Sequence, residues 1–311
     1  MLARRTIGLL FVAAVAFGLA PRSARADDPP VQPLGAAPAK RRVEWSPDWP
    51  RFRIWEYAGT AVLGGVSIYL YRYVPPPDQP RWHGENGFDT TLRGWFVADG
   101  RDGRESAGKV GDIVSWGGAA VPFIIDLPVI ALVHRQPGVA WQVLMMDLEA
   151  EAVSGFIKNL LFAEAGRARP SYADCAANPN YDALCGTPSN NASFPSGHTV
   201  NIATAAGLAC VHHRYLPIYG HPAADAGVCV LLSGATAVTM VTRLVSDRHW
   251  ATDDIAGAVL GYAAGYGLPW LLHYRHGGPA GEARAATGTT RPVLLPIASG
   301  TGLGLGLLWA M

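Results

Sequence analysis

The chain has 311 residues, of which 50% are hydrophobic and 16% are charged, and its formal net charge is +1. An electrostatic nucleic-acid binder would carry a strong basic excess, so this balance excludes that class of function. The composition suits a membrane protein or a protein with a large core.

The first 26 residues have the features of a signal peptide. Two arginines precede an apolar run from residue 7 to 20, and small residues surround a cleavage position after Ala26. An uncleaved membrane anchor is the alternative. Residues 27–57 predict a Pro- and Ala-rich linker followed by a basic, aromatic segment that seeks the membrane interface.

Residues 58–276 predict one helical domain. Its first apolar segment, 58–74, is a marginal membrane span, and the stronger segments follow it. Acids at positions 147, 149 and 151 should face other helices, because lipid would not tolerate them. We therefore predict an all-α, membrane-embedded helical bundle of five or six spans, with the active site at one membrane face. The stronger segments are 112–133, 139–162, the run from 197 to 210, 226–245 and 254–274.

The stretch FPSGHT, residues 194–199, stands before an apolar run and predicts the first turn of a helix. Pro195 suits that turn, and Ser196 and Gly197 leave backbone N–H groups free at the positive end of the helix dipole. This is an anion site, most naturally for phosphate. His198 could hold a proton for a leaving oxygen. By itself, the tetrapeptide PSGH is more typical of an ordinary helix cap.

Two further clusters strengthen the phosphate interpretation. In the segment TRLVSDRHWATD, His249 stands four residues before Asp253, so the two share a helix face. Asp253 can then accept a hydrogen bond from one ring nitrogen and leave the other free as a nucleophile. Lys158, Arg169 and Arg243 supply three basic groups, which suits the three equatorial oxygens of a transferring phosphoryl group.

The chain carries three motifs in order: a Lys followed by Arg-Pro, then PSGH, then Arg-x5-His-x3-Asp. In this order they resemble the type 2 phosphatidic acid phosphatase and vanadium haloperoxidase superfamily, over roughly residues 109–276. The resemblance implies that His249 is the nucleophile and forms a phosphohistidine, that Asp253 orients it, and that His198 protonates the leaving group. It implies no cofactor. The phosphate-binding residues that it implies are Lys158, Arg169, Ser196, Gly197 and Arg243.

The chain departs from the family pattern at two positions. Thr242 replaces a Ser and keeps the hydroxyl. Lys158 lies eleven residues before Arg169 where the family has seven, which preserves the helix face but places the Lys about one turn deeper. Arg167 could supply the same charge, so the first basic position stays open between Lys158 and Arg167.

The four cysteines divide into two pairs. Cys175 and Cys185 lie ten residues apart in a polar loop and predict a disulfide, whereas Cys210 and Cys229 lie in apolar helices and predict buried free thiols. A metal site is not expected, because no second Cys pair or His pair supplies tetrahedral spacing. His212 and His213, at a helix end, predict an interfacial position.

The charge of the loops predicts the orientation. Arg135, Arg214 and Arg275 lie in the loops opposite the motifs, so the positive-inside rule makes those loops cytoplasmic. The motifs would then face the periplasm from the bacterial inner membrane, where a disulfide persists. A cleaved signal with six spans would put the motifs inside, so either 58–74 lies on the surface or the signal is not used.

The predicted function is metal-independent hydrolysis of a lipid phosphate monoester or pyrophosphate. The expected partners are the lipid substrate and the bilayer, with no nucleic acid and no obligate protein partner. The alternatives are a vanadate-dependent haloperoxidase using the same site and a non-catalytic membrane scaffold or transporter. Residues 277–311 form a tail of unknown structure, compatible with a hairpin or a membrane-resting strand.

Overall fold

The computed structural model describes residues 42–83, 86–280, 292–299 and 302–309. The signal peptide and most of the linker that we predict fall outside these residues. The described residues up to Ala280 form one compact unit, and the described residues 292–299 and 302–309 belong to another.

The first unit is helical, which confirms the helical character that we predict for this part of the chain. Its main helices are α2 (Ile54–Tyr73), α3 (Gly87–Phe96), α4 (Arg101–Val121), α5 (Pro137–Ala165), α6 (Tyr172–Ala177), α7 (Gly197–Tyr215), α8 (Pro222–Val245), α9 (Ala251–Tyr262) and α10 (Leu268–Leu272). Short π-helical segments are η1 (Pro122–Asp126), η2 (Val129–Val133) and η4 (Ala263–Gly267), and 3-10 turns are η3 (Pro188–Asn191) and η5 (Tyr274–His276).

Three helices are long and apolar enough to cross a membrane by length and composition, namely Arg101–Val133, Pro222–Val245 and Ala251–His276. The first of these contains Pro122 and Pro128, which lack a backbone N–H, and the helix widens into η1 and η2 around them. Of the five or six spans that we predict, three are matched by candidate helices among the described residues.

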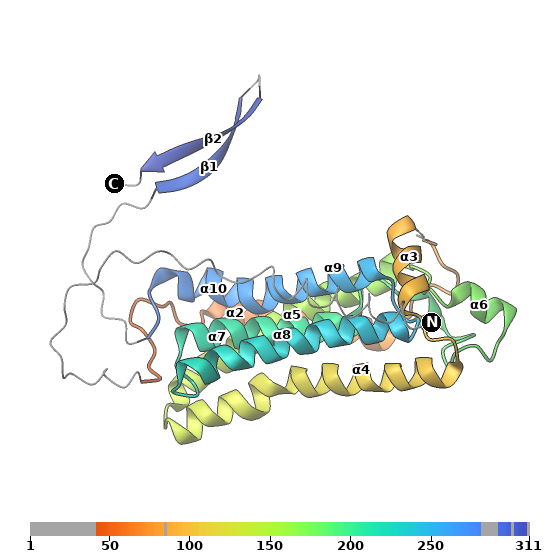
Figure 1. Cartoon of the computed structure of the whole chain (residues 1–311). Coiled ribbons are helices and arrows are strands. Elements are labelled where there is room, and N and C mark those ends of the chain that lie inside the picture. The colour runs from red at the N-terminus through yellow and green to blue at the C-terminus, as the bar shows by residue number, and fades with distance from the viewer. Residues whose placement is uncertain (1–41, 84–85, 281–291, 300–301, 310–311) are drawn as a thin grey trace. The chain divides into compact units, whose positions relative to one another are not determined.

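Helix α7 lies inside the bundle, in contact with α4, α5, α8 and α9 (Figure 1). Most of its side chains from Thr199 to Leu208 are fully buried, and many of them are alanines. Small side chains allow neighbouring helices to approach closely. The chain in this way surrounds the helix that begins with the PSGH motif.

The contact between α7 and the chain from α9 to η4 is made by three glycines spaced four residues apart. A Cβ atom built on any of them would lie only 2.0–2.8 Å from a carbonyl oxygen of α7. Real side chains do not tolerate such distances, so the two backbones touch directly. The pairs of glycine and facing carbonyl are Gly257 with Ser196, Gly261 with Val200, and Gly265 with Thr204.

The structure contains two disulfides. Cys175 bonds to Cys185 within the loop that follows α5, and Cys210 bonds to Cys229 between α7 and α8. The prediction of free thiols at positions 210 and 229 is therefore wrong. Helices α7 and α8 are antiparallel neighbours joined by a short turn, which brings these two cysteines to a Cα separation of 4.5 Å.

The two adjacent histidines of α7 are buried, so the prediction of an interfacial position is also wrong. His212 Nε2 lies 3.0 Å from Asp147 Oδ1, and His213 Nδ1 lies 2.7 Å from Asp225 Oδ1. Asp147 is one of the acids of α5, and it faces another helix as expected. Both histidines have buried carboxylate partners, which explains why burial is tolerated.

The second unit contains a two-stranded antiparallel hairpin of β1 (Pro292–Ser299) and β2 (Gly302–Trp309). The pairing runs from Pro292 opposite Trp309 to Ser299 opposite Gly302. Of the two interpretations of the apolar tail, the structure has the hairpin.

We predict that Gly265→Ala destabilises the bundle by about 1–3 kcal/mol, because the new methyl group overlaps the α7 backbone. Gly234→Ala on α8 is the control, because a Cβ there meets nothing within 4 Å. The control should be neutral or slightly stabilising, since Ala favours helix over Gly. Thermal unfolding midpoints in detergent would measure both. Equal midpoints for the two variants would contradict the proposed contact.

Candidate active site

The predicted site residues meet at one end of the bundle, the end that carries α3 and α6 (Figure 1). The start of α7, the end of α8, the start of α9 and the loop after α5 all reach this end. Arg169 Nη1 donates to the Arg248 carbonyl at 3.1 Å, and His249 Nδ1 lies 2.7 Å from the Ser193 carbonyl. These contacts join segments that are distant in the sequence into one cluster.

His249 is held by a backbone carbonyl. A carbonyl oxygen only accepts hydrogen bonds, so Nδ1 carries the proton that it donates to Ser193, and Nε2 carries the lone pair. Asp253 Oδ2 lies 3.9 Å from Nδ1, beyond hydrogen-bond distance. The expected tautomer is therefore present, but the residue that fixes it is Ser193 and not Asp253.

Asp253 is bonded to other groups. It accepts hydrogen bonds from Arg167 Nη1 at 2.5 Å, from Ser193 Oγ at 2.6 Å and from the Trp250 N–H at 2.9 Å. The carboxylate thus holds Ser193, whose carbonyl holds His249. Asp253 is a positioning residue that acts through Ser193.

Arg167 lies behind His249, on the far side of Asp253 from the ring. Its side chain is fully buried, pairs with Asp89 at 2.8 Å as well as with Asp253, and stacks on the Trp82 ring at 4.3 Å. A guanidinium between two buried carboxylates is engaged in structure. The structure therefore does not bring Arg167 to the phosphate side of the site.

Lys158 lies deeper in the bundle than the phosphate motif, as its spacing from Arg169 predicts. Its Nζ lies 3.4 Å from Asn201 Oδ1, one helical turn beyond Gly197. The position seven before Arg169 is Phe162, whose ring lies 3.1 Å from the place of a Cβ on Gly197. The Lys158 Cδ atom lies 3.4 Å from the same place, so the Lys158 side chain passes beside the start of α7. The Arg167 guanidinium is instead paired with Asp89 and Asp253.

Three arginines line the site. Arg169 donates to the backbone carbonyls of Ser189, Ala192 and Arg248, and among the described residues it forms no ion pair with a carboxylate. Burial, together with repulsion by Arg248 and Arg243, lowers the pKa of Arg169 to about 10. An excess of buried positive charge favours an anionic ligand.

Arg248 was missed at the level of sequence, although it directly precedes His249 in the motif. Its guanidinium lies over Gly108 of α4, where a Cβ would come within 3.2 Å of the Arg248 Cζ atom. Its charge is close enough to lower the pKa of Arg169. We therefore count Arg248 with Arg169 and Arg243 as the third arginine of the site.

Asp112 of α4 was also missed, because no motif marks it. Its Oδ1 lies 3.1 Å from His198 Nε2 and 2.9 Å from Arg243 Nη2. The Asp112 side chain is 40% exposed, so this part of the cluster opens to solvent. Asp112 thus contacts both the His198 ring and the Arg243 guanidinium.

The start of α7 offers backbone donors more than side-chain donors. The Ser196 hydroxyl is buried and lies 3.0 Å from Thr199 Oγ1, which donates to Asp254 Oδ1 at 2.6 Å. The first N–H groups of a helix have no acceptor within the helix, and here they belong to Gly197 and His198. Ser196 therefore serves as a buried anchor of the turn.

The nucleophile candidate is neutral. Burial first, and then the charges of Arg169 and Arg243, hold the pKa of His249 well below its ordinary value. A neutral imidazole with a free lone pair is the form that can attack phosphorus. The arrangement combines a neutral nucleophile with three cations for an anionic substrate.

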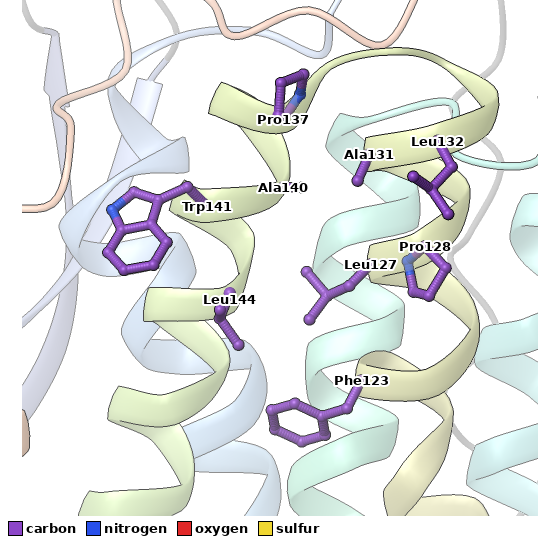
Figure 2. A pocket seen from close by; sticks show the side chains of 9 residues that line it. All are labelled: Phe123, Leu127, Pro128, Ala131, Leu132, Pro137, Ala140, Trp141 and Leu144. Carbon is purple, nitrogen blue, oxygen red and sulfur yellow. The ribbon is translucent and has the colours of Figure 1, made fainter.

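An apolar crevice of about 400 Å³ opens between η1 and η2 on one side and α5 on the other (Figure 2). A second hollow of about 320 Å³ shares Phe123 with it and reaches Trp116, whose ring packs edge-on against His198 at 6.3 Å. The two hollows follow α4 and its continuation away from the site. The crevice is lined by Phe123, Leu127, Pro128, Ala131, Leu132, Pro137, Ala140, Trp141 and Leu144.

Comparison with known proteins agrees with the motifs. A lipid A 1-phosphatase from Porphyromonas gingivalis is 26% identical over 185 residues, which are 58% of this chain and 36% of that relative. The chain thus spans about a third of the curated relative it matches. No solved structure matches the chain. The family model described as the PAP2 superfamily matches residues 140–276, a part of the chain that includes both histidines and all three arginines of the site.

Proposed function

We propose that this chain is a phosphatase that hydrolyses a phosphate monoester or pyrophosphate on a membrane lipid, through a phosphohistidine intermediate and without a catalytic metal. The observation that carries the proposal is a buried, neutral His249 beside three arginines. The named activity of the relative, a lipid A 1-phosphatase, supports a lipid substrate.

The reaction would proceed in two displacements. Arg169, Arg243 and Arg248, with the N–H groups at the start of α7, would bind the phosphoryl oxygens. His249 Nε2 attacks phosphorus while the bond to the leaving oxygen breaks, and His198 gives its proton to that oxygen. Water then attacks the phosphohistidine and returns a proton to His198, which releases inorganic phosphate.

We further propose that the bundle lies in the bacterial inner membrane with the site at its periplasmic face. Helices α5 and α7, of 29 and 19 residues, would be about 44 Å and 28 Å long. They can cross beside the three candidate spans, because their polar side chains face the bundle. This gives five spans, and α2 would be the sixth.

The apolar crevice suits the hydrocarbon chain of the substrate, and the second hollow, which Glu151 and Asn201 line together with apolar side chains, shares Phe123 with it. The two hollows begin beside His198, where the leaving oxygen would lie, and continue into the apolar crevice (Figure 2). From Trp116 to Leu132 the helix rises by about 24 Å, which is most of the hydrocarbon thickness of a bilayer. We propose that an acyl or prenyl chain lies there while its phosphate meets the arginines.

Purified protein in EDTA should release inorganic phosphate from one or more of phosphatidic acid, phosphatidylglycerophosphate, a polyprenyl pyrophosphate and lipid A. The charge at the transferring phosphoryl group is neutralised by arginines, so adding Mg²⁺ or Zn²⁺ should not raise the rate. The assay is phosphate release at 25 °C. A requirement for added divalent metal in protein that stays folded in EDTA would overturn the mechanism.

The two histidines should respond differently to the acidity of the leaving group. His249→Ala should reduce turnover of both a lipid monoester and a nitrophenyl phosphate by about 10⁴-fold or more, because the nucleophile is lost. His198→Ala should lose about 10²–10⁴-fold on the lipid, but less on the nitrophenyl ester, whose leaving group needs no proton.

Acid-labile phosphate labelling should disappear only in the His249 variant. Asp253→Asn should impair both substrates alike, because it acts through Ser193 on the nucleophile and not on the leaving group. Identical behaviour of the two histidine variants would show that the assigned roles are wrong.

The charge of Arg169 should set the acid limit of activity. The pKa of His249 is depressed, so kcat/KM should fall only when the pH drops through that low value and the imidazole becomes protonated. Removing one repelling charge raises this pKa, so Arg169→Gln should move the acid limb to higher pH, besides slowing the reaction. Arg51→Gln, at an exposed position, is the control. An acid limb at the same pH in all three proteins would contradict the electrostatic argument.

Filling the hollow should affect long-chain substrates selectively. Ala119→Trp places a large ring between Trp116 and Phe123 and should lower kcat/KM for a long-chain lipid phosphate about tenfold, with little change for nitrophenyl phosphate. Ile113→Trp on the same helix is the matched control, because that side chain is 73% exposed. Equal losses on both substrates would argue against a chain-binding groove.

A further inference from the structure

A second cluster of ligand-type side chains lies far from the phosphate site. Glu56 of α2, Glu149 of α5 and His273 at the end of α10 each offer one ligand atom, and these atoms lie within 4.8 Å of one another. All three residues are buried, with 0%, 7% and 0% of their surface exposed. Glu149 precedes the end of α5 by sixteen residues, about 24 Å along the helix, so this cluster is remote from the arginines.

The hydrogen bonding of His273 leaves a lone pair directed at a carboxylate. Nδ1 lies 2.8 Å from the Pro50 carbonyl, which can only accept, so Nδ1 carries the proton. Nε2 is buried, has no hydrogen-bond partner in the part of the chain that the structure describes, and lies 3.5 Å from Glu56 Oε1. Two lone pairs that face each other in a buried place need a cation or a proton between them.

The same imidazole is positioned firmly. Phe52 stacks on it at 6.0 Å, and Trp45 meets it edge-on at 6.4 Å. A histidine whose Nδ1–H is fixed by a backbone carbonyl is the arrangement that orients metal ligands through Nε2. The ring is therefore already placed as a ligand would be.

The charges of the cluster do not balance. Arg53 pairs with Glu56, through Nη2 to Oε1 at 2.8 Å and Nε to Oε2 at 2.9 Å, and so neutralises one carboxylate. Among the described residues Glu149 has no such partner, and its Oε2 is buried without a hydrogen bond to any of them. Neutral His273 adds no charge, so the negative charge of Glu149 is not balanced within the cluster. Two ligand atoms, Glu149 Oε2 and His273 Nε2, also lack a hydrogen-bond partner among the described residues.

We propose that Glu56, Glu149 and His273 bind a divalent transition-metal ion, for which Zn²⁺ is the best fit, as a structural site. Mixed imidazole and carboxylate ligands suit zinc, whereas Mg²⁺ and Ca²⁺ prefer oxygen alone. The Nε2 to Oε1 separation of 3.5 Å is close to the roughly 3.4 Å between two ligands of a tetrahedral zinc site. The ion would tie the start of α2 to α5 and to the end of α10.

The test uses full-length protein in detergent, with any affinity tag removed, stripped by a chelator and then given ZnCl₂ alone. The wild type should retain about one zinc per chain after dialysis, and its thermal unfolding midpoint should rise with zinc. Glu149→Gln and His273→Gln should each lose both the bound zinc and the rise. Glu151→Gln, two residues along α5, should keep both.

If a single proton is shared between the carboxylates and His273 instead, the wild type will bind no zinc and its midpoint will not move. Equal zinc content in the wild type and both site variants would also overturn the proposal, because the metal would then lie elsewhere. If one variant fails to fold, the other variant and the zinc response of the wild type still test the proposal. The EDTA test of catalysis is separate, because it measures phosphate release and not metal content.

Discussion

The direct backbone contact between α7 and α9 is the constraint on which the site depends. Glycines spaced four residues apart let the two helices touch, and the Ser196 N–H donates to the Asp253 carbonyl at 3.0 Å where both helices begin. His198 and His249 come from these two helix starts. A wider helix pair would separate the proposed proton donor, His198, from the proposed nucleophile, His249, however well the arginines were placed.

Around this contact the charged side chains have two different roles. Asp253 and Asp89 hold Arg167 behind the nucleophile, where all three side chains are buried. On the substrate side, Asp112 pairs with Arg243, while Arg169 and Arg248 form no ion pair among the described residues. The carboxylates therefore stabilise the frame of the site, and the positive charge that stays uncompensated is directed at the substrate.

The spacing of residues in the sequence predicted those features of the site that depend on a single helix or a single turn. The intervals between Arg243, His249 and Asp253 and the position of Ser196 before a helix are local, and the structure brings these residues together. Contacts between different helices could not be predicted from residue spacing. Asp112, the Ser193 carbonyl as partner of His249, the disulfide from Cys210 to Cys229, and the cluster around His273 each join residues far apart in the sequence. Nothing in a single sequence marks which faces of two helices will meet.

The disulfide between α7 and α8 also bears on how the protein can be produced. Cys210 in the last third of α7 is cross-linked to Cys229 in the first third of α8, in addition to the pair in the loop after α5. Chains made in a reducing compartment would carry four thiols in place of two cross-links. Preparations with different thiol content would then be mixtures of chemically distinct proteins. A thiol titration is accordingly the first quality control for any recombinant batch.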